Sequence, residues 1–437
     1  MSISNTYSAF KDSGIEWAED IPEHWQILPL RSIFHERKEK NIGPKTEFIL
    51  SVMKDIGVIP YDEKGNVGNK KSENIENYKV VHPNDLVINK MNAIIGSLGI
   101  SKYHGALSQV YIVLYPRNKQ LAVNRFLAYL FGVKPFQKSL IKISTGMMEL
   151  RESINFIEFK NLRLPIPPLN EQNKIADFLD QKTAFIDEAI AKKQRLIELL
   201  KEQKAILINR AVIRGLNPNV PMKESGVEWI GEIPAHWEFK KLSNISRVVR
   251  GASPRPAGDP RFFASEFGTP WVTVAEITKD SNLYLTDTKE YLTDAGVSAS
   301  QFFPKGLVLF TNSGATLGVP KILSVGCCAN DGVLAFKSLS KSVDSEYLYF
   351  YLSAQTTRLR EEIKQGSGQP NLNTFIVKNI PFPIPPLPEQ ISIVNYLFKL
   401  ITIQANSILS CEKQIQKLQE YKQALIAHAV TGKIKVS

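Results

Sequence analysis

The sequence predicts an α+β protein in which two globular domains of mixed helix and strand accompany two long helices that pair as an antiparallel coiled coil. Three observations lead to this prediction. A Trp-rich segment occurs twice, a Pro-rich segment occurs twice, and a long stretch with helical periodicity follows each Pro-rich copy. A chain of 437 residues is also too long for one compact core, so more than one domain is expected.

The repeated segments mark equivalent joints in the two halves of the chain. The Trp-rich segment at 13–25 reads Ser-Gly-x-Glu-Trp and then Ile-Pro-x-His-Trp, and it returns at 225–237. The Pro-rich segment at 164–172 returns at 382–390. Between these joints the two halves have little sequence in common. The pattern indicates two different recognition domains held in equivalent poses.

The repeat divides the chain into four pieces. We expect a first recognition domain at 1–164, a Pro hinge with the first long helix at 165–215, a second recognition domain at 216–382, and a hinge with the second long helix at 383–437. Both domains mix short β-like runs with turn signals, and each closes with a helical stretch. The expected strands include 85–88, 110–114, 270–274 and 306–310.

Each long segment carries one apolar stripe with residues spaced three, four or seven apart, as in an amphipathic helix. Beyond Pro388 neither segment contains Pro or Gly until Gly215 and Gly432, which are placed as C-terminal stops. Each helix should therefore run for about 40 residues, or roughly 60 Å at about 1.5 Å per residue.

A small domain cannot cover a helix of that length, so the two stripes are expected to cover each other. A pseudo-twofold relation between the repeats would make the pair antiparallel. The alternative is that each helix packs on its own domain. The residues expected at the coiled-coil interface are Ile186, Ile190, Ile197, Leu200, Leu207, Ile408, Ile415, Leu418 and Leu425.

The Pro-rich segment is expected to form a stiff, extended exit from each domain, because its prolines fix φ and disfavour helix in the residues before them. In the first copy Asn170 is a candidate N-cap, with Glu171 in the first turn. In the second copy Pro388 and Glu389 suit helix initiation. The repeated hinge implies the same angle between domain and helix in both halves.

The bulk composition indicates a cytoplasmic protein with an anionic partner. A net charge of +11 and a pI near 9.3 favour nucleic acid, although many cytosolic proteins are basic with no such partner. Three cysteines, of which Cys327 and Cys328 are adjacent, form no disulfide framework and fit a reducing compartment. No apolar run is long enough to span a membrane, and the N-terminal residues lack the features of a signal peptide.

The two motifs, in this order and in duplicate, resemble the DNA-specificity subunit of type I restriction–modification systems, and the resemblance covers about 13–433. It implies that each variable domain is a target recognition domain that reads one half of a bipartite, asymmetric sequence in double-stranded DNA. It also implies that the antiparallel coiled coil sets the length of the spacer between the two halves.

The resemblance further implies a non-catalytic subunit that recruits two methyltransferase subunits and is joined by restriction subunits. S-adenosylmethionine, ATP and Mg would belong to those partners, and no cofactor is expected in this chain. The residues agree with this interpretation. The sequence contains no Gly-x-x-x-x-Gly-Lys-[Ser/Thr] loop, no Asn/Asp-Pro-Pro-Tyr tetrapeptide, and no histidines at metal-ligand spacing.

Polar and basic loops in the two domains are the candidates for contact with DNA, since such side chains bind phosphates and base edges. The alternatives are turns with incidental arginines at 250–256 and plain strand-turn segments at 89–92 and 105–109. The loop 365–372 has a less polar counterpart at 144–150 in the first domain. The candidate DNA-binding residues are Lys90, Asn92, Ser144, Thr145, Arg250, Ser253, Arg255, Ser367, Gln369 and Asn371.

Two alternatives stay open at this point. One is the specificity subunit of a related system in which cleavage and methylation share one polypeptide. The other belongs to a different class: a coiled-coil scaffold that presents two ligand-binding domains unrelated to DNA. The salt dependence of DNA binding separates a DNA-specificity subunit from the non-DNA scaffold, because the affinity from phosphate contacts falls steeply as ionic strength rises.

Overall fold

The chain folds into two compact units, each of which contains one globular domain and part of both long helices. The first unit comprises Met1–Lys193 with Glu412–Ser437, and the second comprises Gln194–Cys411. The computed structural model describes residues 6–54, 56–66, 70–118, 122–145, 153–314, 316–364 and 372–436.

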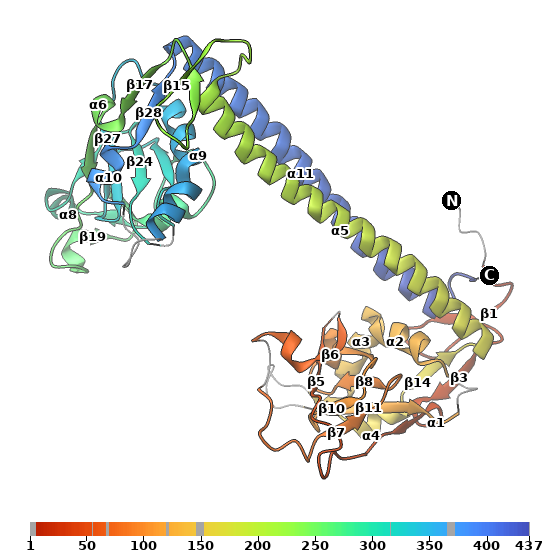
Figure 1. Cartoon of the computed structure of the whole chain (residues 1–437). Helices are drawn as coiled ribbons and strands as arrows, with labels where there is room; N and C mark the ends of the chain where they lie inside the picture. Colours follow the sequence, from red (N-terminus) through yellow and green to blue (C-terminus); the bar gives the residue numbers. More distant parts are fainter. Residues whose placement is uncertain are drawn as a thin grey trace. The chain divides into compact units, whose positions relative to one another are not determined.

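The first domain is built around an antiparallel four-stranded sheet in the order β4–β11–β8–β9. Its central strand β8 is buried along its whole length, as expected for an apolar run flanked by turn signals. Two further strand pairs, β5–β6 and β7–β10, lie in the same domain, and the helices α2 and α3 pack beside the sheet (Figure 1). The bounds are β4 (Phe34–Glu36), β5 (Leu50–Met53), β6 (Gly57–Pro60), β7 (Lys79–Val81), β8 (Leu86–Asn89), β9 (Leu98–Ile100), β10 (Gly105–Leu107), β11 (Tyr111–Pro116), α2 (Asn124–Gly132) and α3 (Lys134–Ser139).

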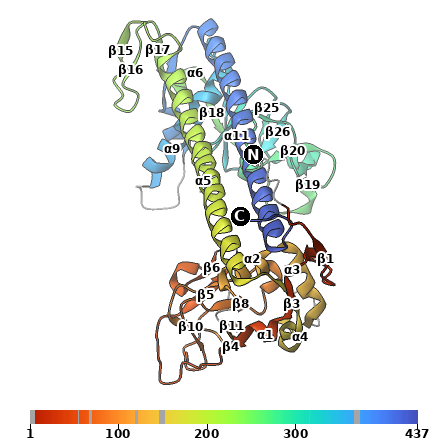
Figure 2. The same ribbon diagram turned by 90° about the vertical axis from the view of Figure 1, so that its right-hand side faces the viewer.

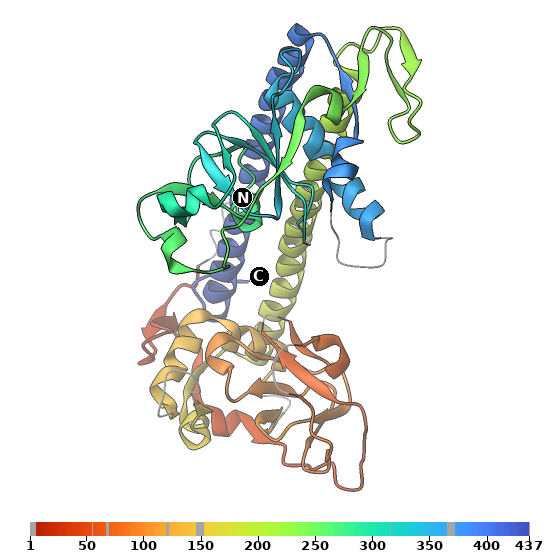
Figure 3. The ribbon, with the colours of Figure 1, turned by 90° about the vertical axis from the view of Figure 1, so that its left-hand side faces the viewer.

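The second domain contains a five-stranded sheet in the order β18–β27–β24–β25–β21 and a second one in the order β19–β22–β20–β26–β23. The helix α9 packs along β25 and β24, and α10 packs against β18 and α6 (Figures 1 and 3). The bounds are α6 (Leu242–Ile245), β18 (Arg247–Arg250), β19 (Phe263–Ala264), β20 (Thr269–Val272), α7 (Val274–Thr278), β21 (Tyr284–Leu285), β22 (Tyr291–Leu292), α8 (Asp294–Ser298), β23 (Phe302–Phe303), β24 (Val308–Thr311), β25 (Pro320–Leu323), β26 (Cys327–Ala329), β27 (Val333–Lys337), α9 (Ser345–Lys364) and α10 (Thr374–Lys378).

Each domain contains a four-strand arrangement of the same kind, although the two sequences do not indicate it. The strands β4, β11, β8 and β9 have the same order and the same antiparallel pairing as β18, β27, β24 and β25. The four expected strands overlap with β8, β11, β24 and β20, with bounds that differ by one or two residues at the ends. The halves of the chain therefore diverge in side chains while they keep one common framework.

The Pro-rich segments are strands rather than free linkers. In the first domain β14 (Arg163–Ile166) pairs antiparallel with β3 (Gln26–Pro29), and in the second domain β28 (Pro381–Ile384) pairs with β17 (Glu238–Lys241). The expected extended conformation is confirmed. Each exit strand is also tied to the strand that directly follows the Trp-rich segment, so the two repeated motifs form one joint.

Both long helices extend slightly beyond the length expected from the sequence. The helix α5 (Leu169–Arg214) has 46 residues, and α11 (Leu387–Val430) has 44. The glycines that follow, Gly215 and Gly432, adopt positive φ of 71° and 73°, which confirms both predicted stops. The prediction of Asn170 as an N-cap is wrong, because α5 already begins at Leu169 and the Pro168 carbonyl accepts the first helical N–H groups.

The two long helices run antiparallel within each unit, side by side in Figures 1 and 2. In the first unit Lys422 Nζ lies 2.7 Å from Asp187 Oδ1, and Lys193 donates to Gln414. In the second unit Gln404 Nε2 donates to Gln203 Oε1 at 3.4 Å. The predicted fold class, two α/β domains with an antiparallel pair of long helices, is confirmed.

The expected interface residues are buried to different degrees. Ile186 and Leu425 are fully buried in one cluster of the first unit, and Ile190 and Leu418 pack against that cluster. The other members of the set are half-buried: Ile197, Leu200, Leu207, Ile408 and Ile415. Within this set, burial is greatest near the first globular domain, and Gln404 and Cys411 are also buried in the middle of α11.

Each long helix ends in the core of a globular domain. In the second unit Ala211, Val212 and Ile213 at the end of α5 belong to the same buried cluster as Trp237. In the first unit the last turn of α11 belongs to the cluster that contains Trp25. An added Cβ on Gly432 would lie 2.3 Å from Pro22 Cδ, so this close approach requires a glycine.

Candidate nucleic-acid interface

The repeated joint is held by a glutamate in the first turn of each long helix. In the first unit Glu171 Oε2 lies 2.8 Å from His24 Nε2, and Glu171 Oε1 accepts from Trp25 Nε1 at 3.1 Å. Tyr7 also donates its hydroxyl to Glu171, and burial together with this hydrogen bond raises the pKa of Tyr7. The helix thus starts at a fixed point on the Trp-rich segment.

The second joint repeats the first with fewer bonds. Glu389 Oε2 lies 2.9 Å from His236 Nε2, as in the first copy. Trp237 is buried like Trp25, but its Nε1 has no hydrogen-bond partner within the described ranges. The joint therefore keeps its geometry in both halves, although the second copy has less hydrogen bonding.

A fully buried glutamine follows each of these glutamates. Gln172 accepts from the Val123 N–H and donates to the Pro167 carbonyl, both at 2.8 Å. Gln390 accepts from the Asp344 N–H and donates to the Ser342 and Pro385 carbonyls, all at 2.8 Å. Each glutamine joins its exit strand to the start of α2 or α9. The joint consequently orients a whole domain against its long helix.

The first domain contains a groove of about 690 Å³ at one edge of its sheet. The turn after β8 and the turn before β11, which the sequence placed among the candidate segments, both line it. Asn92 and Gln109 in these turns are exposed. Asparagine and glutamine amides can pair with the donor and acceptor of an adenine edge in the major groove.

Lysines form another part of this groove. Tyr61 Oη accepts from the Lys71 N–H at 2.8 Å, which holds the exposed Lys70–Lys71 pair in place. Lys64 lies over the Tyr61 ring, 4.2 Å from its centroid. None of the lining residues that the structure describes carries a carboxylate. Lysines are the kind of side chain that binds phosphates, and amides are the kind that pairs with base edges.

An equivalent backbone hydrogen bond occurs at the corresponding sheet edge of each domain. The Ile154 N–H donates to the Lys90 carbonyl at 3.2 Å, and the Leu372 N–H donates to the Asn312 carbonyl at 2.7 Å. Lys90 follows β8 and Asn312 follows β24, so the two residues are equivalent. Asn312 is buried, and its Oδ1 has no partner in the part of the chain described.

The loop after β18 packs closely against the turn before β27. An added Cβ on Gly251 would lie 2.3 Å from the Asn330 carbonyl oxygen. Arg250 Nε donates to the Asp331 carbonyl at 2.6 Å, and Arg255 Nη2 lies 3.3 Å from Asp331 Oδ2. The loop is thus ordered by backbone contacts, and the guanidinium of Arg255 is largely exposed to solvent.

A model of the family described as the type I restriction modification DNA specificity domain matches residues 22–200 and 234–417. The chain belongs to this family. Each match begins in a Trp-rich segment and ends within a long helix, so the family unit comprises one globular domain and most of one helix.

Three known proteins illustrate the likeness. The specificity subunit of the type I restriction enzyme MjaVIII from Methanocaldococcus jannaschii is 24% identical, and the alignment covers 95% of this chain and 94% of that protein. A solved structure that concerns complex assembly and conformational transition of the type I R-M system superposes with a TM-score of 0.72 at 16% identity, covering 94% of this chain and 98% of that chain. The HsdS subunit from Thermoanaerobacter tengcongensis gives 0.59 at 16% identity, with the same coverage.

The two globular domains are therefore the target recognition domains of a type I specificity subunit. Such subunits are not catalytic, and the enzymatic activities of the system lie with its other subunits. Among the residues that the structure describes, no group of His, Cys, Asp and Glu side chains is arranged to hold a metal ion. Cys327 and Cys328 are buried in β26, and burial raises the pKa of both thiols.

The described ranges contain no helix that is long and apolar enough to cross a membrane.

The candidate DNA-binding residues fall into three groups. Asn92 lines the groove, and Lys90 lies two residues before it in the same turn after β8. Ser144 lies in β12 (Ser144–Thr145), and its hydroxyl donates to the Leu140 carbonyl at 2.9 Å. In the second domain Arg250 ends β18, and Ser253 and Arg255 lie in the loop that follows. Ser367, Gln369 and Asn371 lie outside the described residues, as does the side chain of Thr145.

Sequence reasoning missed the groove lysines and the equivalence of Asn312 with Lys90. Lys70 and Lys71 reach the groove because a tyrosine hydroxyl from another segment holds their backbone. Asn312 matches Lys90 only through strand pairing, and no local motif marks either residue. For these lysines the excess of positive charge was the signal in the sequence that pointed to a basic surface.

Proposed function

We propose that this specificity subunit reads a bipartite, asymmetric sequence in double-stranded DNA, one half with each target recognition domain. One observation supports the proposal most directly. The sheets of the two domains have the same strand order, yet their equivalent edges carry different side chains. Lys90 and Asn92 lie at that edge in the first domain, and the partly exposed Ser313 lies there in the second, next to the buried Asn312. Equal poses with unequal side chains favour two different half-sites.

The antiparallel helices would set the distance between the two half-sites. An α-helix advances by about 1.5 Å per residue and is stiff over its length, so a helix pair is a suitable spacer. The glutamate and glutamine of each joint support this role, because they fix the angle at which each helix leaves its domain.

The long helices would also dock two methyltransferase subunits. Phe185 on α5 and Ile403 on α11 occupy equivalent positions relative to the two Pro-rich segments, and their side chains are 60% and 64% exposed. Large apolar side chains at equivalent exposed positions favour two copies of one partner. In this arrangement S-adenosylmethionine would be bound by the methyltransferases, and ATP and Mg by restriction subunits.

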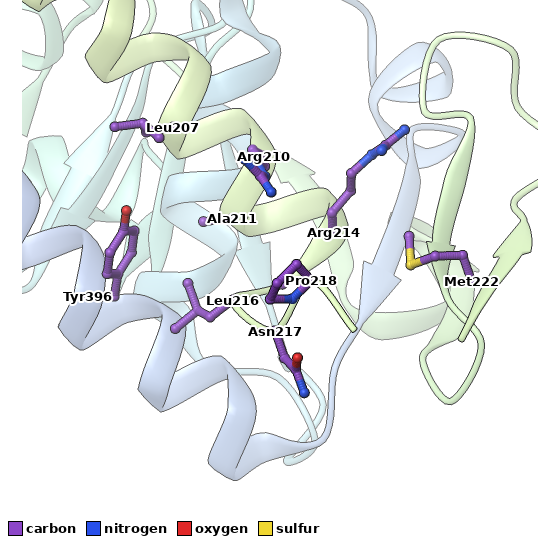
Figure 4. Close-up of a pocket in the computed structure, with 10 residues that line it drawn as sticks. Leu207, Arg210, Ala211, Arg214, Leu216, Asn217, Pro218, Met222 and Tyr396 are labelled. Carbon is purple, nitrogen blue, oxygen red and sulfur yellow. The ribbon is translucent and has the colours of Figure 1, made fainter. Parts of the chain in front are cut away.

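A cleft of about 480 Å³ beside the end of α5 offers a further docking surface in the second unit (Figure 4). Leu216 and Tyr396 provide apolar walls, and Arg210 and Arg214 are exposed at its rim. Neither arginine forms an ion pair with any residue that the structure describes. An acidic and apolar segment of a partner subunit would complement this surface.

Mapping of methylated adenines with the assembled complex tests the reading of DNA. Asn92→Ala is expected to relax only one half of the mapped motif and to reduce discrimination there about tenfold or more, because one bidentate base contact is worth ~1–3 kcal/mol. Lys70→Ala and Lys71→Ala should instead weaken binding to all sequences, and each should lower the salt slope by about one.

Lys102→Ala provides the matched control, since Lys102 is exposed in the same domain but does not line the groove. It should leave both motif and affinity nearly unchanged. If Asn92→Ala reduced the sequence specificity in both halves of the mapped motif, the proposal that each domain reads one half would be contradicted. Binding of duplex DNA that does not change with salt would favour the non-DNA scaffold over the proposed function.

The docking surface is tested by the stoichiometry of the complex in native mass spectrometry. Phe185→Asp and Ile403→Asp should each weaken the binding of one methyltransferase copy by at least about tenfold, and the double variant should lose both copies, because a charge replaces a central apolar contact. Leu409→Asp is the control, rotated by about 120° around α11 at about 100° per residue. Two bound copies in the double variant would refute this docking surface.

The related system, in which one polypeptide both methylates and cleaves, predicts a different complex. It would recruit a single type of partner, and that partner would cut DNA without separate restriction subunits. Reconstitution with methyltransferase subunits alone, followed by a cleavage assay, therefore separates the two possibilities.

A further inference from the structure

A short helix in each target recognition domain displays one large apolar side chain to solvent. These helices are α4 (Phe156–Asn161) and α10 (Thr374–Lys378). Ile157 is 69% exposed and Phe375 is 73% exposed, and the two residues precede their Pro-rich segments by the same interval, so they are equivalent in the repeat. The two domains differ in most of their sequence, yet both have an exposed apolar residue at this position. Such a residue indicates a contact with a ligand.

Both helices are anchored so that this side chain points away from the core. Asn155 and Asn373 cap them, each accepting a backbone N–H from its own helix. Phe159 and Val377, two residues after the exposed ones, are buried. Helices as short as these are not stable alone, so the caps and buried contacts hold each of them in place.

The helices begin at the edge where DNA is proposed to bind. The residues just before the two caps, Ile154 and Leu372, donate to the carbonyls of Lys90 and Asn312, which follow the central strands. In the second domain α10 then packs against β18, whose last residue is Arg250 (Figure 1). Phe375, in the first turn of α10, is thus continuous with the candidate interface.

The charge around Phe375 favours nucleic acid over a protein partner. The sequences of α6, β18 and α10 contain no Asp or Glu. Arg247, Arg250 and Lys378 in the same elements are exposed. A phenylalanine among these cationic side chains suits a ligand whose outside is anionic and whose interior is apolar and aromatic. Duplex DNA has phosphates outside and stacked bases inside.

We propose that Phe375 enters a base step of the bound DNA as an apolar wedge that unstacks it, with Ile157 in the same role in the other half-site. This inference rests on the proposed function, since it assumes that the domain binds duplex DNA. Apolar side chains inserted between bases are a known means of bending a duplex so that it meets more of the protein surface. The aromatic ring makes Phe375 the stronger wedge of the two.

The test uses the assembled complex and duplexes that carry the fluorescent base 2-aminopurine at successive positions of the second half-site. A rise in fluorescence reports unstacking. The wild-type complex should show a rise of at least about twofold at one step, and Phe375→Ala should abolish it. Phe375→Ala should also bind the intact duplex about tenfold more weakly, but should bind a duplex with a mismatch at that step nearly as well as wild type, because the mismatch is already unstacked.

Two further variants keep the result interpretable. Phe375→Leu retains an apolar wedge and should restore most of the fluorescence rise. Phe267→Ala removes a phenylalanine that is 84% exposed in the loop between β19 and β20 of the same domain, and it should behave as wild type. Equal loss of fluorescence in Phe267→Ala would overturn the assignment to Phe375.

The outcomes separate the wedge from the proposed function. If the wild-type complex binds duplex DNA in a salt-dependent manner without any rise in fluorescence, the wedge is wrong while DNA recognition stands. If the complex binds no DNA, the proposed function itself fails. If Phe375→Ala releases a methyltransferase subunit and leaves the fluorescence rise unchanged, Phe375 is a protein contact and the wedge is overturned.

Discussion

Replacing Leu425 with aspartate should lower the free energy of unfolding of the first unit by about 3–5 kcal/mol. Leu425 is only 5% exposed, and it belongs to the same buried cluster as Ile186 and Trp25. The substitution removes an apolar side chain from a packed core and places a carboxyl group there without a partner. The last turns of α11 should then detach from the first domain.

Urea unfolding followed by tryptophan fluorescence measures this effect, because Trp25 lies in the affected core. Leu409→Asp is the matched control on the same helix, since Leu409 is 48% exposed, and it should cost less than about 1 kcal/mol. Leu418→Asp should fall between the two, because Leu418 is only partly buried at the edge of the cluster. Equal costs for Leu425→Asp and Leu409→Asp would contradict the packing of α11 on the first domain.

The helices and the joints could be predicted from the sequence because their signals are local. The apolar stripe repeats every three or four residues, and Gly215 and Gly432 mark the ends of the helices. The Pro-rich segment similarly indicates extended backbone by itself. The error at Asn170 also has a local cause: the Pro168 carbonyl already begins the helix, so no polar side chain is needed at the cap.

The shared sheet and most of the candidate interface could not be predicted, because both depend on pairings between distant segments. Nothing local relates Lys90 to Asn312, and their equivalence appears only when β8 and β24 take the same place in their sheets. The groove likewise assembles lysines and amides from several separate turns. Sequence patterns describe the face of one strand, whereas strand order is decided by the packing of the whole domain.

The joint could be predicted from the sequence less fully than the helices, but better than the order of the strands. Its residues were found by repetition alone, and Glu171, the partner of His24, lies 147 positions away in the chain. The repeated glutamine, which carries most of the link between exit strand and domain, has no signal beyond being part of the motif. Repetition can therefore identify important residues without showing what they contact.

Gln390→Leu should lower the free energy of unfolding of the second unit by about 2–4 kcal/mol. Gln390 is fully buried, and the substitution leaves the Asp344 N–H and the Ser342 and Pro385 carbonyls without its amide. The Pro385 carbonyl loses a buried hydrogen bond, which costs ~1–3 kcal/mol, whereas the partly exposed Asp344 N–H and Ser342 carbonyl cost less because water can replace the amide. The leucine recovers part of this loss by its own burial. Gln181→Leu, at an exposed position of α5, is the control and should change stability by less than about 0.5 kcal/mol.

The same substitution in the first joint should be less harmful. In that joint Glu171 is bonded to Tyr7, His24 and Trp25, so the exit strand and the helix stay connected when Gln172 is lost. Among the described residues of the second joint, His236 is the one side chain bonded to Glu389, and the indole N–H of Trp237 makes no bond. Gln390→Leu should accordingly also speed hydrogen exchange in the first turn of α9, which the Asp344 N–H precedes. If Gln172→Leu proves as destabilising as Gln390→Leu, the additional bonds of the first joint contribute nothing to its stability.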